Sequence, residues 1–169
     1  MNEVFKEQIV KRKPSAKDTF KRIGLVLAVI VIVIIALGII PAFAPFIILA
    51  ACFGAWFLMS YLKVEYEYAF TDGELDIDAI YNRSRRKRLF SARVNDFEIM
   101  AHVEDNMRIG EFQSAVQTID YSSGVVSEDT YAFLINYKGK RTKIIIEPNA
   151  VMLKALATVL TRRRLHIKQ

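Results

Sequence analysis

The sequence predicts two structural classes in one chain: a membrane α-helical hairpin, and an α+β domain of antiparallel strands with a C-terminal helix. The first observation is an apolar run of forty residues, 23–62, without one Asp, Glu, Lys, Arg or His. The second is a period-two alternation of apolar and polar residues after this run, which is typical of half-buried strands. The third is an amphipathic pattern near the end of the chain, which indicates a helix.

The apolar run is long enough for two membrane helices, because one crossing needs about 20 apolar residues. Pro41 and Pro45 mark the turn between them, so we expect a two-helix transmembrane hairpin over 23–62, with helices at about 23–40 and 46–62. A cleavable signal peptide does not fit, since its apolar core has roughly 7 to 15 residues and lies near the start of the chain. A buried core hairpin does not fit either, because the run lacks a polar stripe.

The charges that flank the run predict its orientation. Seven Lys and Arg residues and three acidic residues precede it, whereas the loop around Pro41 carries no charge. Positive flanks stay in the cytoplasm, and two spans return the chain to the side on which it started. We therefore expect a multi-pass protein of the cell (cytoplasmic) membrane with both termini in the cytoplasm. The single Cys52 lies inside the run, so the sequence offers no disulfide framework.

Residues 1–22 are expected to form a basic cytosolic N-terminal arm. Asn2 is a plausible N-cap for a short helix that carries Phe5, Ile9 and Val10 and ends at Pro14. Such a helix either lies on the membrane surface or serves only as a positive flank, and the sequence leaves both interpretations open.

Residues 63–169 predict one small cytosolic domain. Two hairpins are clear: strands at 64–70 and 74–80 around Asp72-Gly73, and strands at 131–137 and 142–147 around Lys138-Gly139. Weaker patterns predict strands near 87–92, 97–103 and 117–121, in an antiparallel order. Pro148 then precedes an amphipathic helix over 149–164, with Arg162, Arg163 and Arg164 in its last turn.

This order of elements, together with three stretches of sequence, resembles a known family. The stretches are TDGELDI, IDYSSG and YAFLINYKGKRTKIIIEPNAVMLKAL. They are similar to uncharacterised bacterial two-span membrane proteins with a cytosolic bacterial PH-like domain. The resemblance covers nearly the whole chain, and it implies a PH-like antiparallel β-barrel of six or seven strands capped by the C-terminal helix. It also implies a bacterial membrane, and it brings no catalytic residue.

The sequence shows no catalytic, cofactor or metal motif. A Gly-rich phosphate loop, HExxH and CxxC are missing, and His102 and His166 lack metal-ligand spacing. The acidic residues from Asp72 to Asp78 alternate with Leu75 and Ile77 as a strand does, unlike an EF-hand loop. We therefore expect no enzyme, no cofactor and no bound metal.

The densest cluster of charge is the candidate site, and we expect it in the turn between the second and third strands. We interpret it as a contact with anionic lipid headgroups, with a solvated turn or a topogenic signal as the alternative. Nucleic-acid binding is disfavoured, because only Tyr81 and Phe90 flank the cluster as possible stacking residues. Its members are Arg83, Arg85, Arg86, Lys87 and Arg88.

These observations favour an integral membrane protein that presents a cytosolic PH-like binding or scaffolding module. Its expected partners are the lipid bilayer, anionic headgroups and an unidentified membrane or cytosolic protein. The alternative is an accessory subunit of a transport or channel complex, although the spans carry no ionisable residue of the kind that marks ion pathways. Small residues four apart, Gly24 with Ala28 and Ala50 with Gly54, suit either packing of the two spans or a homo-oligomer.

Overall fold

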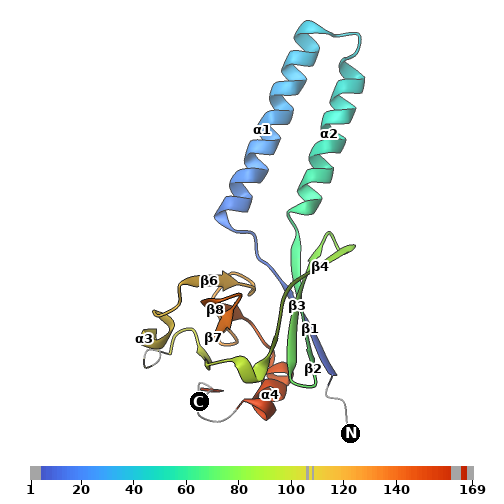
Figure 1. Cartoon of the computed structure of the whole chain (residues 1–169). Coiled ribbons are helices and arrows are strands. Elements are labelled where there is room, and N and C mark those ends of the chain that lie inside the picture. Colours follow the sequence, from blue (N-terminus) through green and yellow to red (C-terminus); the bar gives the residue numbers. More distant parts are fainter. Residues whose placement is uncertain (1–4, 106, 108, 161–164, 167–169) are drawn as a thin grey trace. The chain divides into compact units, whose positions relative to one another are not determined.

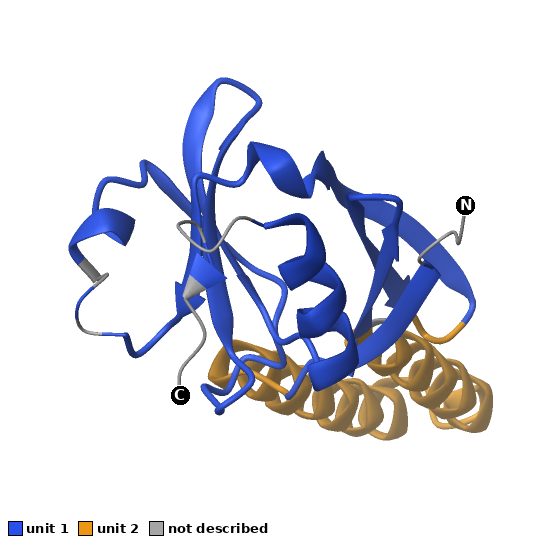
Figure 2. Cartoon of the chain, turned by 90° about the horizontal axis from the view of Figure 1, so that it is seen from below, with its two compact units in different colours: residues 1–13, 65–80, 84–169 blue, residues 14–64, 81–83 orange. Residues whose placement is uncertain are grey.

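The computed structural model describes residues 5–105, 107, 109–160 and 165–166. The chain divides into two compact units, which Figure 2 shows in different colours. Unit 1 contains Met1–Lys13, Glu65–Ile80 and Ser84–Gln169, and unit 2 contains Pro14–Val64 and Tyr81–Arg83. The first thirteen residues thus belong to unit 1.

Unit 2 is built on two antiparallel helices, α1 (Ala16–Ile39) and α2 (Ala44–Tyr61), which pack side by side (Figure 1). α1 begins seven residues before the apolar run, because Ser15 and Asp18 form a capping box in which the Asp18 carboxylate accepts the Ser15 N–H at 3.1 Å. Among the described residues, α1 is the helix that is long and apolar enough to cross a membrane, and α2 is apolar but falls short of that length.

The first sheet of unit 1 has four strands in the order β1-β2-β3-β4. β1 pairs antiparallel with β2 along seven residues, from Phe5 opposite Thr71 to Lys11 opposite Glu65. The helix expected at the start of the chain is therefore wrong. Pairing satisfies the backbone groups along this edge of β2 and buries Val10, which a separate helix would not do. The bounds are β1 (Phe5–Lys11), β2 (Val64–Thr71), β3 (Glu74–Tyr81) and β4 (Arg85–Arg93).

The second sheet has five strands in the order β6-β8-β7-β5-β9. β7 and β8 form the expected antiparallel hairpin, but β6 runs parallel to β8 and β5 parallel to β9, so the wholly antiparallel order is wrong. The long connection over 121–130 explains the parallel pairing of β6 with β8, because it lets the chain cross from one side of β8 to the other. The bounds are β5 (Ile99–His102), β6 (Gln117–Asp120), β7 (Tyr131–Tyr137), β8 (Lys140–Ile146) and β9 (Leu165–His166).

Three helical segments complete unit 1: η1 (Val94–Asp96), α3 (Ile109–Phe112) and α4 (Ala150–Val159). Asn149 caps α4, because its Oδ1 accepts the Met152 N–H at 2.8 Å. The helix ends at Val159 and the next residue is extended, so it is shorter than the sequence predicted. The three arginines expected in its last turn, 162–164, lie outside the described residues.

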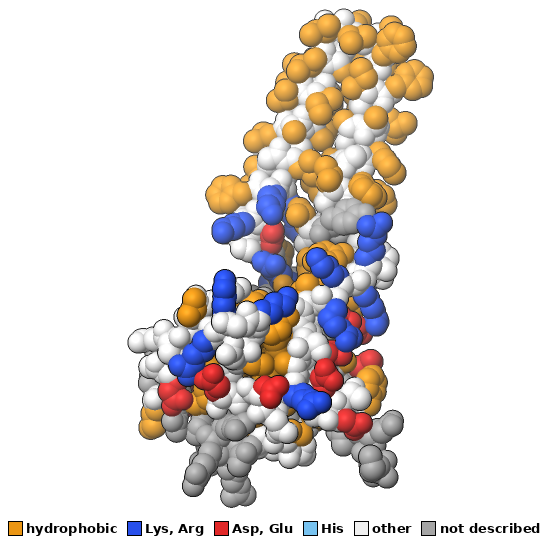
Figure 3. Space-filling model, in the orientation of Figure 1, with side chains coloured by type: hydrophobic (Ala, Val, Ile, Leu, Met, Phe, Trp, Pro, Cys, Tyr) orange, Lys and Arg blue, Asp and Glu red, His pale blue; other side chains and the backbone are white. Residues whose placement is uncertain are grey.

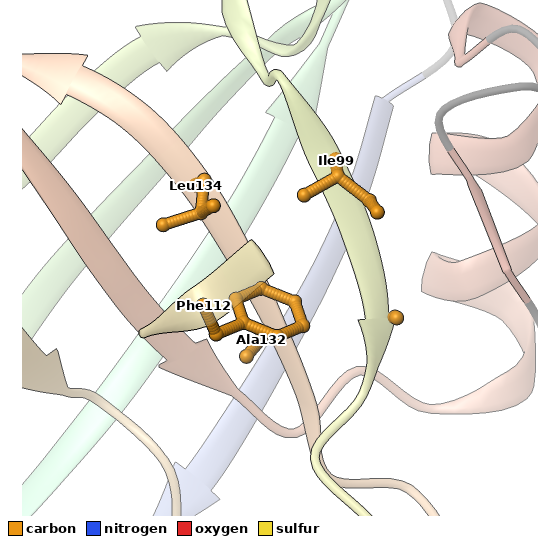
Figure 4. Close-up of a cluster of buried hydrophobic side chains, with 5 residues drawn as sticks. Ile99, Phe112, Ala132 and Leu134 are labelled. Carbon is orange, nitrogen blue, oxygen red and sulfur yellow. The ribbon is translucent and has the colours of Figure 1, made fainter. Parts of the chain in front are cut away.

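The core of unit 1 is apolar and aromatic. Figure 4 shows one cluster, in which Phe112 lies against Leu134, Ala132 and Ile99. A second group of rings contains Phe97 stacked on Phe133 with centroids 3.9 Å apart, and Phe90 5.8 Å from Phe133. These contacts explain why the alternating apolar residues of β4, β5 and β7 form strands.

The α+β class with an N-terminal helix pair and a C-terminal helix is confirmed, and the arrangement is consistent with a PH-like fold. The hydrogen-bonded ladders of the described residues form one four-stranded and one five-stranded sheet, rather than a single closed barrel.

Candidate functional site

The helix pair of unit 2 exposes large apolar side chains along its length (Figure 3). Ile34 is 65% exposed on α1, and Leu49 is 71% exposed on α2. Water-soluble monomers rarely expose contiguous apolar patches of more than a few hundred Å². This surface therefore suits an apolar surrounding, and among the described residues length and composition identify α1 as the candidate span.

One end of the same helix pair is charged instead of apolar, and the charged residues of unit 2 lie there. Lys17, Lys21 and Arg22 lie in the first two turns of α1, and Lys63 follows the C-cap of α2. Asp18, in the first of those turns, is engaged in the capping box. The charged end of the helix pair is therefore strongly basic.

A hydrogen bond adds the turn between β3 and β4 to this basic end. The Asn82 N–H donates to the backbone oxygen of Lys63 at 3.3 Å, so residues 81–83 belong to unit 2 while both strands belong to unit 1. Arg83 and Lys63 are both exposed. The structure thus places one arginine of the predicted cluster at the basic end of the helix pair.

The rest of the predicted cluster does not lie in the turn, because Arg85, Arg86, Lys87 and Arg88 are the first residues of β4. Of the five, only Arg83 is a turn residue. β4 is an edge strand of its sheet, and a basic edge discourages pairing with other chains.

Two cations of the cluster are engaged in ion pairs on their own sheet. Arg86 contacts the buried Glu67 at 3.0 Å, and Arg88 contacts Asp76 at 2.9 Å and Asp78 at 3.0 Å. The described residues place no carboxylate within ion-pair distance of Arg85 or Lys87. Their charge is therefore available to an external anion, whereas that of Arg86 and Arg88 is largely compensated.

Three hairpin turns of the chain share an unusual backbone in which two consecutive residues have positive φ. The pairs are Asp72-Gly73 (48° and 88°), Asn82-Arg83 (48° and 55°) and Lys138-Gly139 (52° and 76°). Asp72-Gly73 and Lys138-Gly139 are two-residue hairpin turns, which favour glycine because side chains rarely adopt these angles. The turn between β3 and β4 has three residues, 82–84, and Arg83 shares its positive φ with Lys138.

A polar network that sequence reasoning missed joins three segments of unit 1, and Tyr68 is one of its centres. The Tyr68 hydroxyl donates to Tyr121 O at 2.6 Å and accepts the Glu147 N–H at 3.2 Å. Burial raises the pKa of Tyr68 well above its ordinary value, and burial raises the pKa of Tyr121 to about 12. Both hydroxyls therefore stay neutral, and that of Tyr68 serves as a structural hydrogen-bonding group.

Glu147 is the second centre of this network. Its carboxylate accepts the Ser123 N–H and the Ser127 hydroxyl, each at 3.0 Å. Burial alone would raise the pKa of Glu147, but the hydrogen bonds from Ser123 and Ser127, together with the charge of Lys13, hold this pKa below its usual value. A carboxylate held in this way is a weak base, so we interpret the network as a structural one. We call the hydrogen-bonded group of Tyr68, Tyr121, Ser123, Ser127 and Glu147 the clasp.

The clasp also holds the start of the chain. Gln8 donates to Glu147 O at 2.8 Å and accepts the Asn149 N–H at 2.7 Å, and the Lys13 N–H donates to Ser123 O at 2.7 Å. The partners are up to 141 residues apart in the sequence, so no local pattern reveals them. The only signal was the family resemblance, because two of the three stretches on which it rests contain IDYSSG and EPN.

The acidic residues after Asp72 are also accounted for within unit 1. Asp76 and Asp78 bind Arg88, and Glu74 accepts the Ser91 hydroxyl at 2.8 Å. A polar cleft of about 690 Å³ lies at this turn and is bordered by Asp72 and Arg93. No group of three or more His, Cys, Asp or Glu that could hold a metal ion occurs in the part of the chain that the structure describes.

Comparison with known proteins gives one match. The family described as "Bacterial PH-like domain (DUF6106)" matches residues 2–165. No curated protein and no solved structure matches the chain.

Proposed function

The chain belongs to the bacterial PH-like domain family, and from this premise we propose that it is a membrane-anchored binding and scaffolding module, not an enzyme. The helix pair is the anchor, and the domain of unit 1 is the module, presented on the cytosolic side. Anionic lipid headgroups are its first ligand, and the basic turn between β3 and β4 is the contact. The observation that carries the proposal is the hydrogen bond from Asn82 to Lys63, which holds this turn at the end of the helix pair.

The dimensions of the helix pair support the anchor. An α-helix rises about 1.5 Å per residue, so the 18 residues of α2 extend about 27 Å, close to the roughly 30 Å hydrocarbon core of a bilayer. The apolar part of α1 from Ile23 to its end at Ile39 has a similar length. Together they form a two-span hairpin, so the proposal adds α2 as a second span to α1, the candidate that length and composition identify among the described residues.

The distribution of charge supports a cytosolic module. Lys17, Lys21, Arg22 and Lys63 flank the two spans at one end, and the turn between the helices is uncharged. Positive flanks remain cytoplasmic, so both termini and unit 1 lie on that side. The same residues lie at the depth of the headgroups, because they directly flank the apolar segments.

The energetics make the contact worth testing. Each Lys or Arg near an anionic leaflet contributes about 1 kcal/mol, and the attraction decays over a Debye length of about 8 Å at physiological salt. Arg83 in the turn, with Arg85 and Lys87 at the start of β4, are the cations that we assign to this contact. Arg86 and Arg88 contribute little, because their ion pairs already compensate their charge.

Hydrogen exchange of the full chain in lipid nanodiscs tests this proposal. Amides over 81–88 should exchange several-fold more slowly in nanodiscs that contain phosphatidylglycerol than in nanodiscs of phosphatidylcholine alone. The double variant Arg85→Ala/Lys87→Ala should lose this difference. A control that removes two exposed charges elsewhere, Lys140→Ala/Lys154→Ala, should keep it. Equal exchange of the unmodified chain in both lipids would refute the headgroup contact.

A further inference from the structure

The two sheets of unit 1 end, within the described residues, in four edge strands: β1 and β4 in the first sheet, and β6 and β9 in the second. An edge strand presents unpaired backbone groups to which another strand can add. β4 begins with a run of basic residues, which would repel the same run of a second copy. β6 has four residues and β9 has two, whereas β1 has seven. β1 is therefore the edge best suited to accept a further strand.

The outer edge of β1 has no backbone partner in the part of the chain that the structure describes. The backbone–backbone hydrogen bonds of Phe5–Lys11 all belong to the antiparallel ladder with β2. In such a ladder only alternate residues direct their N–H and C=O groups toward the partner strand, so the others point away from β2. These groups are available to a strand from outside the chain.

The exposed face of β1 carries two apolar and two charged side chains. Phe5 and Ile9 are 52% and 54% exposed, and Glu7 and Lys11, which share their face, are exposed as well. Val10 lies on the opposite face and is buried. The described residues provide no ion-pair partner for Glu7 or Lys11. The strand thus presents an unpaired acid and an unpaired base on either side of an exposed isoleucine.

This pattern is complementary to itself. When two copies of β1 run antiparallel about Ile9, each residue before Ile9 lies opposite the residue equally far after it. Ile9 then faces Ile9 of the second copy, and Glu7 faces Lys11 on both sides. Opposite charges and apolar pairs directly across two strands stabilise a sheet. Pairing about Glu7 would oppose two carboxylates, and pairing about Gln8 would place Glu7 opposite Ile9, so the Ile9-centred register is favoured.

We propose that two copies of the chain pair through β1, antiparallel about Ile9, and join their four-stranded sheets into one continuous sheet. The proposed function names no protein partner, and this inference supplies one, a second copy of the chain. It rests on the proposed membrane anchor in one respect. A contact between two short strands is small, and two copies anchored in one membrane meet at a raised effective concentration that favours weak contacts.

The geometry of the pairing sets a condition on the strands. The two-fold axis passes between the two Ile9 residues at right angles to the sheet, so both copies enter one membrane when β1 runs along its surface. Residues 12–15 connect β1 to α1, and four extended residues reach about 13 Å. This connection provides the bend between strand and helix that each copy needs.

Cysteine cross-linking of the full chain in lipid vesicles tests the register. In a Cys52→Ala background, Ile9→Cys places two thiols directly opposite each other, with Cβ atoms about 4.5–5.5 Å apart, close to the distance of a disulfide. Phe5→Cys is the matched control, because it lies on the same face of the same strand and is equally exposed. In the proposed register two copies of residue 5 lie about 27 Å apart along the ladder.

Mild oxidation should link Ile9→Cys into a dimer at least about tenfold faster than Phe5→Cys, whose thiols cannot meet in this register. Copies with Glu7→Cys should link to copies with Lys11→Cys, but neither variant should link to itself.

Charge reversal tests the recognition separately from the distance. Glu7→Lys or Lys11→Glu, added to Ile9→Cys, turns two attractive pairs into two repulsive ones and should slow cross-linking about tenfold. The double reversal Glu7→Lys/Lys11→Glu recreates both pairs and should restore the rate. Lys140→Glu, at an exposed position of another hairpin, should leave the rate unchanged.

Three results would overturn the inference. Cross-linking of Ile9→Cys no faster than that of Phe5→Cys would exclude the pairing. Self-linking of Glu7→Cys would place the two-fold axis elsewhere on the strand. Failure of the double reversal to restore the rate would remove the charge pairs from recognition. Retention of the chain in vesicles after alkaline extraction is followed in parallel, and loss of the chain there would refute the proposed anchor instead of the pairing.

Discussion

The hydroxyl of Tyr68 is predicted to be one of the main stabilising groups of unit 1, and Tyr68→Phe tests this. The side chain is fully buried, and its hydroxyl bonds two backbone groups at once, Tyr121 O at 2.6 Å and the Glu147 N–H at 3.2 Å. Phenylalanine fills the same space but leaves both groups without this partner. Each buried polar group that loses its partner costs about 1 to 3 kcal/mol, so for two groups we expect a loss of about 2 to 6 kcal/mol.

The assay is hydrogen exchange of the β7 amides in the full chain, because these strand amides report the unfolding of unit 1. Trp56 fluorescence is unsuitable for this purpose, since the tryptophan lies in α2. Tyr137→Phe is the matched control: it removes the same atom, but that hydroxyl makes a single long contact of 3.5 Å with Leu89 O. It should cost less than about 1 kcal/mol. If Tyr68→Phe cost no more than this control, the bridging role of the hydroxyl would be refuted.

Three further predictions concern the clasp, the first strand and the ion pairs. The folded-state pKa of Glu147 lies below its ordinary value of 4.5, so the ionised group stabilises the fold above that pH, and this contribution is lost as the pH falls through the folded-state pKa. Glu147→Gln should therefore be less stable than the unmodified chain at pH 7, and urea titrations should show the difference in free energy of unfolding shrinking below about pH 4.5. A difference that does not change with pH would exclude the carboxylate as its cause. Deletion of residues 1–13 removes the partner strand of β2, so the remaining chain should lose its protease resistance, and a variant as resistant as the full chain would show that β1 is dispensable. Arg86→Ala, which leaves the buried Glu67 without its ion pair, should cost about 1 kcal/mol in urea denaturation, while Arg85→Ala should stay within about 0.5 kcal/mol; equal costs would contradict the assigned pairing.

Local patterns predicted the elements that local chemistry determines. The turns at Asp72-Gly73 and Lys138-Gly139, and the alternation around them, gave the two main hairpins with nearly correct bounds. Pro148 and the amphipathic pattern after it gave the start of α4 within one residue. In each case the deciding interactions lie within a few residues of one another, so the sequence carries the whole signal.

The first strand could not be predicted in this way, because the partner that makes it a strand lies more than fifty residues away. Phe5, Ile9 and Val10 fit a helical stripe on their own, and only pairing with β2 favours the extended form. The parallel pairing of β6 with β8 likewise depends on a long connection. Tertiary pairing overrode local preference in both places.

The candidate site was predicted in composition but not in arrangement. The charge run from Arg83 to Arg88 was visible, but sequence gave no means of seeing that Glu67, Asp76 and Asp78 compensate Arg86 and Arg88.

The central claim is a hairpin that crosses the bilayer twice and leaves unit 1 in the cytoplasm, and cysteine accessibility tests it most directly. In a Cys52→Ala background, one cysteine at Phe43 marks the turn between the helices and one at Val116 marks unit 1; both native side chains are well exposed, at 63% and 78%. With a membrane-impermeant maleimide, the cysteine at 43 should react in intact cells. The cysteine at 116 should react only when the cytoplasmic face is opened. Labelling of both positions from the same side would contradict the two-span hairpin.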